Sequence, residues 1–452
     1  MSAPPKSVHI TNYYHKNSGG ISTSYNALLA AAARHKRPIR LIVPGENEEI
    51  EDVNEFGRIY YVPAKKSVAF DKRYRVMMPW QYMLTDSIIR KILLKEKPDL
   101  VEITDKYTLS IFGAMVSRNM FKSLGRPAIV HFSCERMDDN IASFIAGGRI
   151  SRWFARQVMG CYNFPSFDYH IANSPYTAEE FRRSVMKETN RRRPDWFLNF
   201  CWRFFRSSLA PVDDRIFICP RGVDADQFSE ERKSPEIRKA MIEKAGIPKD
   251  SIVLLYAGRI SPEKNIGLLA ETMKLLSKDE ESDFRLLVAG AGPQEDWLRS
   301  QAEKHMPGRI KLLGHLDKDT LAGYYANADV FMHPNPKEPF GIAPLEAMAS
   351  GVPVVVPNAG GLLFYATDEN TWLREPEPGA FADAVREIIS DPGLRRKKVE
   401  AGLKTAAENT RERSTDNLIA TYDRILEDFK KRNDLFTDLD RSKKHDFSEL
   451  VS

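Results

Sequence analysis

Apolar residues in the first half of the chain form short runs that alternate with longer segments of helical period. The short runs predict strands over 7–14, 39–45, 100–104, 127–133 and 169–174. The longer segments predict helices over 21–34, 80–97 and 108–122. Runs such as LIVP and AIV are continuous rather than alternating, which is typical of strands buried on both faces of a parallel sheet.

A second series of the same kind follows from residue 216. It predicts strands over 216–220, 251–258, 284–290, 310–314, 330–334 and 352–357, and helices over 262–277, 293–305, 319–327 and 343–350. Two doubly wound α/β domains account for both series. We expect these domains over 1–213 and 214–410, a C-terminal helix over 411–432 and a poorly ordered charged tail over 433–452.

The composition fits a globular chain of two or three domains. The chain has 452 residues, and Lys plus Arg exceed Asp plus Glu by five, a surplus too small to indicate nucleic-acid binding. Its four cysteines are widely spaced, which argues against a disulfide framework or a zinc site. The N-terminus lacks the pattern of a signal peptide, and no run of about 18 apolar residues occurs, so we expect a cytoplasmic protein.

Two cations follow the strand predicted over 251–258. Arg259 comes directly after this strand, and a Ser-Pro pair at 261–262 has the pattern of a helix start that places Lys264 in the first turn. A cation at the positive end of a helix dipole is unfavourable by about 0.3–1 kcal/mol unless an anion lies nearby. The pair therefore suggests a diphosphate clamp. The alternative is two solvated surface charges, with Glu263 as a local partner.

Two carboxylates accompany a second helix start at 339–344. Glu346 lies among apolar neighbours in this helix, and a buried carboxylate is costly unless hydrogen-bond donors, such as sugar or ribose hydroxyls, surround it. Glu338 lies eight residues earlier. We expect both to face the crevice at the carboxyl edge of the sheet, where open α/β sheets bind ligands. The alternative is that Glu346 pairs with an arginine of another layer.

Glycines join two predicted strands to the helices that follow them. Gly19 and Gly20 precede the helix over 21–34, and Gly290 precedes the helix over 293–305. Helix N-termini bind phosphate through their backbone N–H groups, but the G-x-G-x-x-G spacing is absent at the first loop. Each loop is therefore either a phosphate-binding loop or a tight turn.

Several of these segments together resemble a known enzyme family. YAGRISPEKN, VAGAGP, LLGHL and EPFGIAPLEAMASGVPVV are similar to the donor-binding half of glycosyltransferase family 4, and ICPRGVDADQF is similar to the start of that half. The resemblance covers most of 216–361, and GGIS, PDLVEITD and ANSPYTAEEF extend it more loosely to the N-terminal half. It implies the GT-B fold: two Rossmann-like domains facing a cleft, with a C-terminal helix that returns to the N-terminal, acceptor-binding domain.

The resemblance also implies roles for individual residues. Arg259 and Lys264 would hold the nucleotide diphosphate. Glu338 would hold the hydroxyls of the donor sugar, and Glu346 the ribose. The other donor-binding residues that it implies are Gly19, Gly20, Gly258, Gly290, Phe340, Gly341 and Ile342, with His315 and Leu316 near the base.

The family has a histidine after the strand that corresponds to 127–133, near the reacting sugar carbon. His131 is the nearest candidate, although it lies inside the predicted strand, and Ser133 or Cys134 are alternatives for the same position. A single histidine in a strand is otherwise a core residue. The expected catalytic residues are His131, Arg259, Lys264 and Glu338.

The implied activity is that of a retaining hexosyltransferase that moves a hexose from a UDP- or GDP-linked donor to a hydroxyl acceptor. Negative charge develops on the departing diphosphate, so cations stabilise it and neither a metal nor a cofactor is expected. Asp224-Ala225-Asp226 spells the D-x-D of metal-dependent sugar transferases, but it lies away from the clamp and we interpret it as incidental. Alternatives are a nucleotide-sugar epimerase of the same fold and a non-catalytic nucleotide-sugar binding protein.

Basic and aromatic residues are concentrated between 187 and 206. The segment KETNRRRPDWFLNFCWRFFR holds six Lys or Arg and two acidic residues. Such a composition is typical of an interfacial segment whose aromatic rings enter the headgroup boundary while its cations meet anionic lipid. The alternative is that the aromatic residues pack on the N-terminal domain or in a dimer contact. The first interpretation predicts a lipid or lipid-linked glycan acceptor, and a peripheral protein on the inner face of the membrane.

Overall fold

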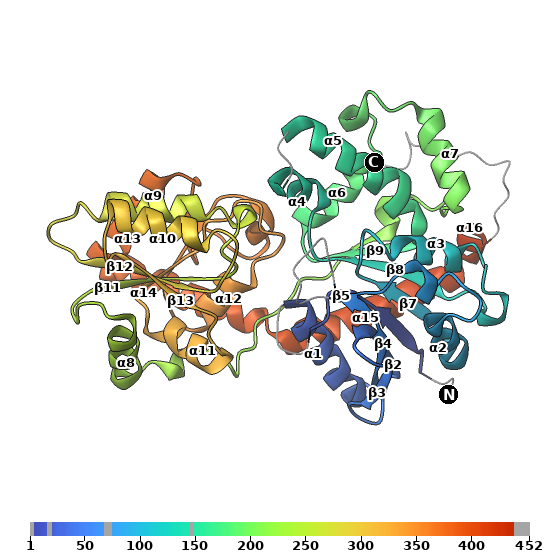
Figure 1. The fold of residues 1–452 in the computed structure, drawn as a ribbon, viewed down its shortest axis with the longest axis horizontal. Helices are drawn as coiled ribbons and strands as arrows, with labels where there is room; N and C mark the ends of the chain where they lie inside the picture. The colour runs from blue at the N-terminus through green and yellow to red at the C-terminus, as the bar shows by residue number, and fades with distance from the viewer. Residues whose placement is uncertain (1–3, 16–19, 67–74, 145–147, 438–452) are drawn as a thin grey trace. The chain divides into compact units, whose positions relative to one another are not determined.

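The computed structural model describes residues 4–15, 20–66, 75–144 and 148–437. The chain divides into two compact units: unit 1 comprises Met1–Pro220 and Thr415–Ser452, and unit 2 comprises Arg221–Ser414. Each unit contains a sheet with helices packed on it (Figure 1).

Unit 1 is built on an eight-stranded sheet in the order β10-β9-β8-β7-β1-β2-β4-β3. Its neighbouring strands are parallel, except that β3 runs antiparallel to β4. The strands are β1 (Ser7–Ile10), β2 (Ile39–Gly45), β3 (Glu49–Asp52), β4 (Gly57–Pro63), β7 (Leu100–Ile103), β8 (Ala128–Ser133), β9 (Tyr169–Ala172) and β10 (Ile216–Ile218). A separate two-stranded sheet pairs β5 (Lys65–Lys66) with β6 (Arg75–Val76).

Two features of this sheet differ from the sequence prediction. The pattern assigns 216–220 to the second series, but β10 pairs in parallel with β9 and so extends the first sheet. The pattern also assigns no strand to β3 and β4, although Ile59, Tyr60, Tyr61 and Val62 of β4 are buried. Three residues are too few to show which sheet a strand joins, because periodicity reports burial and not the partner strand.

The helices of unit 1 include four that the pattern did not assign, α4 to α7. Two predicted helices, over 80–97 and 108–122, are shorter in the structure because a 3₁₀ turn at Pro79–Gln81 precedes α2, and Asn119 with positive φ follows α3. The helices are α1 (Gly20–Arg34), α2 (Ile88–Glu96), α3 (Ser110–Ser117), α4 (Met137–Phe144), α5 (Gly148–Val158), α6 (Pro175–Val185), α7 (Asp195–Phe205), α15 (Arg411–Lys431) and α16 (Asn433–Thr437).

From Thr415 onward α15 packs in unit 1, as the GT-B resemblance implies. Tyr422 is fully buried and donates a hydrogen bond to Glu102 at the centre of the sheet. The chain then forms α16, whose Phe436 is buried against Tyr169 and Phe429. The expectation of disorder from Asn433 is therefore wrong for 433–437, because Phe436 in this charged segment is buried in the core of unit 1. Residues 438–452 lie outside the described residues.

Unit 2 is built on a six-stranded parallel sheet in the order β13-β12-β11-β14-β15-β16. Its strands are β11 (Ile252–Ala257), β12 (Phe284–Ala289), β13 (Ile310–Gly314), β14 (Val330–Met332), β15 (Val354–Pro357) and β16 (Trp372–Arg374). Its helices are α8 (Pro235–Ala245), α9 (Ile266–Leu276), α10 (Glu295–His305), α11 (Lys318–Asn327), α12 (Ile342–Ala349), α13 (Pro378–Ser390) and α14 (Pro392–Glu408). The strand order reverses between β11 and β14, and ligands of open α/β sheets bind at the carboxyl ends of such a pair.

The loop after β11 corrects the helix predicted over 262–277. Pro262–Lys264 form a 3₁₀ turn, Asn265 adopts a left-handed conformation, and α9 begins at Ile266. Lys264 therefore lies before the helix and not in its first turn, so the argument from the helix dipole does not apply to it. Its position is set by the contact that its ammonium makes, described below.

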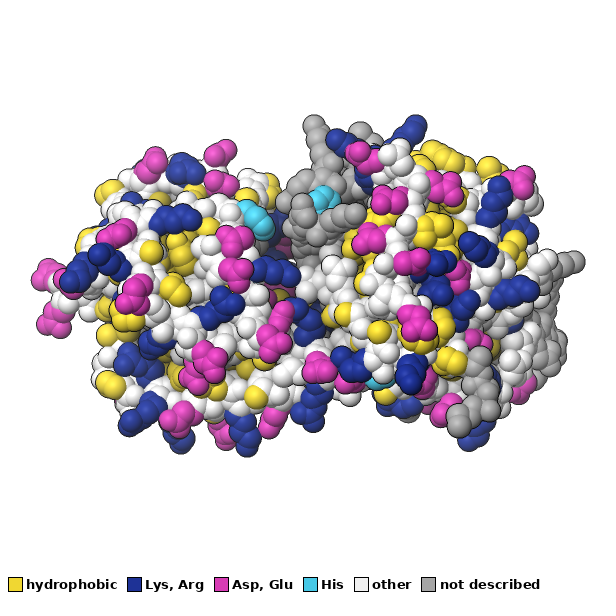
Figure 2. Space-filling model, turned by 90° about the horizontal axis from the view of Figure 1, so that it is seen from below, with side chains coloured by type: hydrophobic (Ala, Val, Ile, Leu, Met, Phe, Trp, Pro, Cys, Tyr) yellow, Lys and Arg dark blue, Asp and Glu magenta, His cyan; other side chains and the backbone are white. Residues whose placement is uncertain are grey.

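Charges of both signs are interspersed over the face of unit 2 that Figure 2 shows, in line with the small net charge of the chain. Among the described residues, no helix combines the length and the apolar character that crossing a bilayer requires.

Candidate functional site

A carboxylate surrounded by donors lies just beyond the carboxyl ends of β11 and β14. The Lys264 ammonium lies 2.8 Å from Glu338 Oε2, and the side-chain amide of Asn335 donates to the same oxygen at 2.9 Å. Glu338 is also fixed through its backbone, because its carbonyl accepts a hydrogen bond from Gly361. The structure thus brings together Lys264 and Glu338, which the sequence places 74 residues apart.

Electrostatics keep the Glu338 carboxylate ionised. Burial acts to raise its pKa, but the Lys264 ammonium and the nearby His333 ring outweigh burial and hold that pKa well below the usual range. An ionised carboxylate is a strong acceptor for hydroxyl donors. Because Lys264 and Asn335 both contact Oε2, the other carboxylate oxygen is the one better placed to accept from a ligand.

His333 is a site residue that the sequence analysis missed. It follows β14 directly, its side chain is 5% exposed, and its Nε2 lies 3.4 Å from Glu338 Oε2. Among the described residues, neither of its ring nitrogens has a hydrogen-bond partner. Apart from this longer contact with Glu338, the ring has no polar partner among the described residues, whereas buried polar groups are generally hydrogen-bonded. The sequence signal that could have identified His333 is the triplet HPN, which lies between a predicted strand and Glu338.

Arg259 lies at the same sheet edge, directly after Gly258. Its side chain is exposed, and none of the described carboxylates forms an ion pair with it. Its carbonyl accepts a hydrogen bond of 2.9 Å from the Tyr256 hydroxyl, which fixes the turn after β11. The guanidinium is therefore available to an anion that enters this edge.

Backbone packing explains the glycines of the site. Gly290 has a φ of +146°, and a Cβ there would lie 1.9 Å from the Gly258 carbonyl oxygen. Gly341 has a φ of +85° and precedes α12, and a Cβ on it would lie 2.2 Å from the Leu362 side chain. These glycines let the loops after β11, β12 and β14 pack closely. The first backbone N–H groups of α12 lie at the same edge, where they can bind an anion.

Glu346 is half-buried in α12 and accepts a hydrogen bond of 3.1 Å from the Tyr325 hydroxyl. Burial raises the pKa of its carboxyl to about 7, although this hydrogen bond and the charge of Arg411 act to lower that pKa. No arginine forms an ion pair with Glu346 among the described residues, in contrast to the alternative of an arginine partner. The carboxyl therefore changes charge near neutral pH.

The remaining donor-site candidates differ in how exposed their side chains are. His315 is exposed and Leu316 is half-buried, and both follow β13. Ile342 is half-buried at the start of α12. Phe340 is 2% exposed and packs on Tyr365, so its side chain belongs to the core of unit 2 and only its backbone can face a ligand.

The candidates in unit 1 do not form a site. His131 is fully buried inside β8, with its Nδ1 3.3 Å from His170 Nδ1 and its ring against Phe167. Burial lowers the pKa of the ring well below its usual value. A side chain with no exposed atom cannot touch a substrate in this conformation, so the structure corrects its expected catalytic role: His131 is a core residue.

The alternatives for that position lie at the end of the same strand. Ser133 is buried and donates to the Glu135 carbonyl, whereas Cys134 is half-buried. Of the two loop glycines, Gly20 is the first residue of α1 and Gly19 lies outside the described residues.

Asp224 of the D-x-D sequence is paired with Arg411, and its carboxylate also accepts from the Gln227 backbone. These contacts give Asp224 a structural role at the start of unit 2. In the described part of the chain, no group of three His, Cys, Asp or Glu side chains is arranged to hold a metal ion.

The chain is similar to known proteins in sequence and in fold. The family described as glycosyl transferases group 1 matches residues 237–405. A GDP-mannose-dependent alpha-(1-6)-phosphatidylinositol dimannoside mannosyltransferase of Mycobacterium tuberculosis is 27% identical over 422 residues, which cover 92% of this chain and 95% of that protein. A D-inositol 3-phosphate glycosyltransferase of Xylanimonas cellulosilytica is 34% identical over 202 residues, which cover 43% of this chain and 47% of that protein.

Among solved structures, sucrose-phosphate synthase of Thermosynechococcus elongatus superposes with a TM-score of 0.67 at 18% identity, covering 93% of this chain and 99% of that chain. This likeness concerns the fold, while the sequence relatives and the family match concern the enzyme class. The chain is therefore a hexosyltransferase with the GT-B fold, and its residues 237–405 are similar to the glycosyl transferases group 1 family.

Proposed function

We propose that this protein transfers a hexose from a nucleoside diphosphate hexose to a hydroxyl acceptor with retention of the anomeric configuration. The observation that carries the proposal is the Lys264–Glu338 contact at the point where the strand order of unit 2 reverses. A cation and an ionised carboxylate held side by side match a ligand that carries a diphosphate next to a polyhydroxylated ring.

In this proposal unit 2 binds the donor along one sheet edge. Arg259, Lys264 and the N-terminus of α12 hold the diphosphate. The carboxylate of Glu338 accepts from sugar hydroxyls, and Glu346 accepts from the ribose. His315 and Leu316, after β13, lie on the side of the base.

His333 and Asn335 extend the donor site. Asn335 fixes Oε2 of Glu338, so that the carboxylate holds its orientation when a sugar replaces part of its surroundings. Among the described residues, the His333 ring has only the 3.4 Å contact of its Nε2 with Glu338, and a sugar hydroxyl would pair with Nδ1. We assign His333 to the recognition of the hexose and not to proton transfer.

The chemistry is a same-face substitution at the anomeric carbon. The bond from C1 to the β-phosphate oxygen breaks, a bond from C1 to the acceptor oxygen forms, and the acceptor proton passes to the departing phosphate. Arg259 and Lys264 stabilise the charge that develops on that phosphate, by an amount on the order of several kcal/mol. Glu338 is poorly suited to act as a covalent nucleophile, because Lys264 and Asn335 already hold one of its oxygens.

The relative from Mycobacterium tuberculosis is named as GDP-mannose-dependent and as acting on a phosphatidylinositol dimannoside. We extend this to the present chain as a proposal: GDP-mannose is the first donor to test, UDP-glucose the second, and the acceptor is a lipid or lipid-linked glycan at the inner face of a membrane. The basic and aromatic α7 supports an acceptor of this kind.

The anomeric configuration of the product tests the proposal. The protein is incubated with an alpha-linked nucleoside diphosphate hexose and a hydroxyl acceptor, and the product is examined by NMR. An alpha-linked product is expected. A beta-linked product would exclude same-face attack. Release of an isomerised donor in the absence of acceptor would instead indicate an epimerase.

A further inference from the structure

Helix α7 is apolar on both of its faces. Leu198, Cys201 and Trp202 are buried in the core of unit 1, whereas Trp196, Phe200 and Phe204 are 70%, 60% and 52% exposed. A helix on the surface of a globular protein ordinarily presents polar side chains outward. An exposed aromatic row on such a helix marks an interaction surface.

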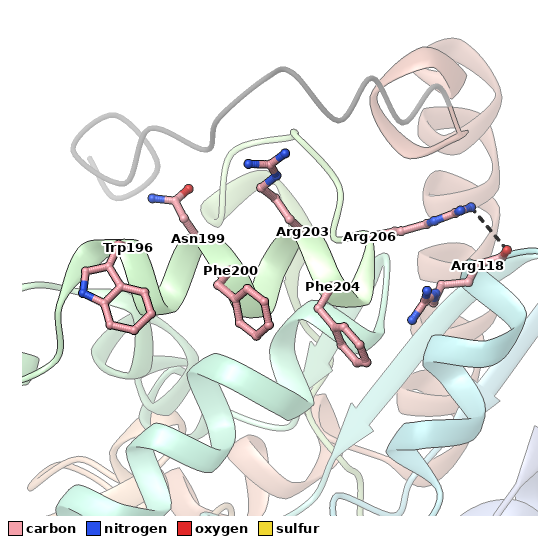
Figure 3. Close-up of a pocket in the computed structure, with 7 residues that line it drawn as sticks. All are labelled: Arg118, Trp196, Asn199, Phe200, Arg203, Phe204 and Arg206. Carbon is pink, nitrogen blue, oxygen red and sulfur yellow. Dashed lines mark hydrogen bonds between the residues drawn. The ribbon is translucent and has the colours of Figure 1, made fainter.

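The exposed row is regular. Trp196, Phe200 and Phe204 are spaced by four residues, which places them on one side of the helix over about 12 Å. Figure 3 shows the three rings pointing to the same side of α7. They line a pocket of about 660 Å³ together with Asn199 and three arginines, Arg118, Arg203 and Arg206.

Arg118 joins the pocket from a different element, the end of α3. Its guanidinium lies 5.0 Å from the centre of the Phe204 ring, and its carbonyl accepts a hydrogen bond of 3.5 Å from Arg206 Nη1. Among the described residues, no carboxylate forms an ion pair with the Arg118 guanidinium. The Arg118 guanidinium therefore lies at the end of the aromatic row, where it is available to an anion.

A second exposed aromatic helix belongs to the same part of unit 1. Trp153 and Phe154 of α5 are 38% and 56% exposed, and Ile150 is 78% exposed. Ala155 of α5 and Trp202 of α7 are buried in the same hydrophobic cluster, so both helices are anchored to one core.

We propose that α7 and the end of α3 bind an anionic phospholipid of a bilayer, with the lipid phosphate at Arg118 and an acyl chain along Trp196, Phe200 and Phe204. The charge of the pocket favours this occupant over a neutral lipid, and the aromatic row favours it over a free anion. The site deepens the proposed function, on which it rests, by naming the surface that brings the enzyme to a lipid acceptor.

Sedimentation with vesicles tests this site. One set of vesicles contains phosphatidylcholine alone, and a second set contains equal parts of phosphatidylcholine and phosphatidylglycerol. The wild type should bind the anionic vesicles preferentially. The variant Arg118→Gln should lose about fivefold in affinity, for the anionic vesicles alone. The variant Trp196→Ser/Phe200→Ser/Phe204→Ser should lose binding to both sets.

Matched controls lie in unit 2, outside the donor site. Trp297→Ser removes an exposed aromatic ring, and Arg396→Gln/Lys397→Gln removes two exposed charges. Both controls should sediment as the wild type does. Equal sedimentation of the wild type and the triple aromatic variant would overturn the proposal. Two other results would also overturn it, each in the absence of vesicle binding. One is a dimer of the wild type that the triple aromatic variant does not form, and the other is a rise in Tm with inorganic phosphate that depends on Arg118.

A thermal shift with GDP-mannose and UDP-glucose on the same preparations separates this proposal from the proposed function. Donor binding without vesicle binding overturns the lipid site and leaves hexosyl transfer intact. Vesicle binding without a shift from any nucleoside diphosphate hexose overturns the proposed function instead.

Discussion

The polar side chains of the two units lie at different places relative to the strands. In unit 2, Lys264, His333 and Asn335 surround Glu338 beyond the ends of the strands, within reach of a ligand. In unit 1, His131 lies within β8 and packs against His170. The same residue type is thus a candidate ligand contact in one unit and a core residue in the other.

Position along the strand explains the difference. A side chain within a parallel strand points into a layer that helices cover, whereas a side chain just after the strand lies at the open carboxyl edge. His333 follows β14 by one residue, and His131 is the fourth of the six residues of β8. The following experiments test whether chemistry is confined to groups beyond the strand ends.

Removing the cation beside Glu338 should have the largest effect. Lys264→Ala is expected to lower kcat by about 100- to 1,000-fold, since it removes preorganised charge at the departing phosphate. Lys264→Arg should retain more activity because it keeps the charge. Steady-state kinetics with saturating donor measure both, and a loss under tenfold for Lys264→Ala would contradict the clamp.

Replacing His333 should have a smaller effect, and on the binding of one ligand only. His333→Phe is expected to weaken binding of the nucleoside diphosphate hexose by about five- to tenfold, the value of one hydrogen bond, and to leave binding of the nucleoside diphosphate unchanged. Calorimetry with both ligands measures the difference. Equal weakening of both would place His333 outside the sugar site.

The raised pKa of Glu346 should make donor affinity depend on pH. The ionised carboxylate accepts from the ribose, so affinity is expected to rise severalfold between pH 6 and pH 8, around the pKa of about 7. Glu346→Gln should flatten this profile. A profile that is unchanged in the variant would assign the dependence to another group.

The same pKa affects stability with a definite sign. The folded protein holds the pKa of Glu346 above its usual 4.5, so folding favours the protonated form. The contribution of this group to the free energy of unfolding is therefore complete below about pH 4.5 and is lost as the pH rises through about 7. Relative to the wild type, Glu346→Gln should raise Tm at pH 8 more than at pH 4.

The smallest effect is expected at the buried histidine. His131→Leu should change donor affinity and kcat by less than about twofold in the folded protein, whatever its effect on Tm, because no atom of His131 reaches a ligand. A loss of activity above 100-fold with an intact fold would restore its catalytic role and contradict the comparison between the units.

The sequence was sufficient for the features that depend on local pattern. Continuous apolar runs predicted most strands of both sheets, and Glu338 and Glu346 were recognisable because their motif is short and contiguous. His333 and Asn335, which also contact Glu338, were missed. The sheet partner of β10 was not predictable, and the sequence left His131 open between a core and a catalytic residue, since both depend on contacts distant in the chain. Arg118 likewise reaches α7 from 78 residues before Trp196, and no spacing rule connects them.

The sequence pattern also placed Lys264 wrongly, because a turn lies where it predicts a helix. The Ser-Pro pair before Lys264 looked like a helix start, but it opens a 3₁₀ turn, and α9 begins two residues after that lysine. Lys264 contacts the Glu338 carboxylate and not Glu263, and the diphosphate clamp predicted for Arg259 and Lys264 stays a prediction.

The most direct test of the donor site compares two ligands on two proteins. Calorimetry measures the affinity of a nucleoside diphosphate and of the corresponding nucleoside diphosphate hexose for the wild type and for Glu338→Gln. If Glu338 holds the sugar, the wild type binds the hexose-bearing ligand more tightly than the diphosphate, and this preference falls by about tenfold or more in the variant. An undiminished preference in Glu338→Gln would contradict the assignment of this edge of unit 2 to the donor hexose.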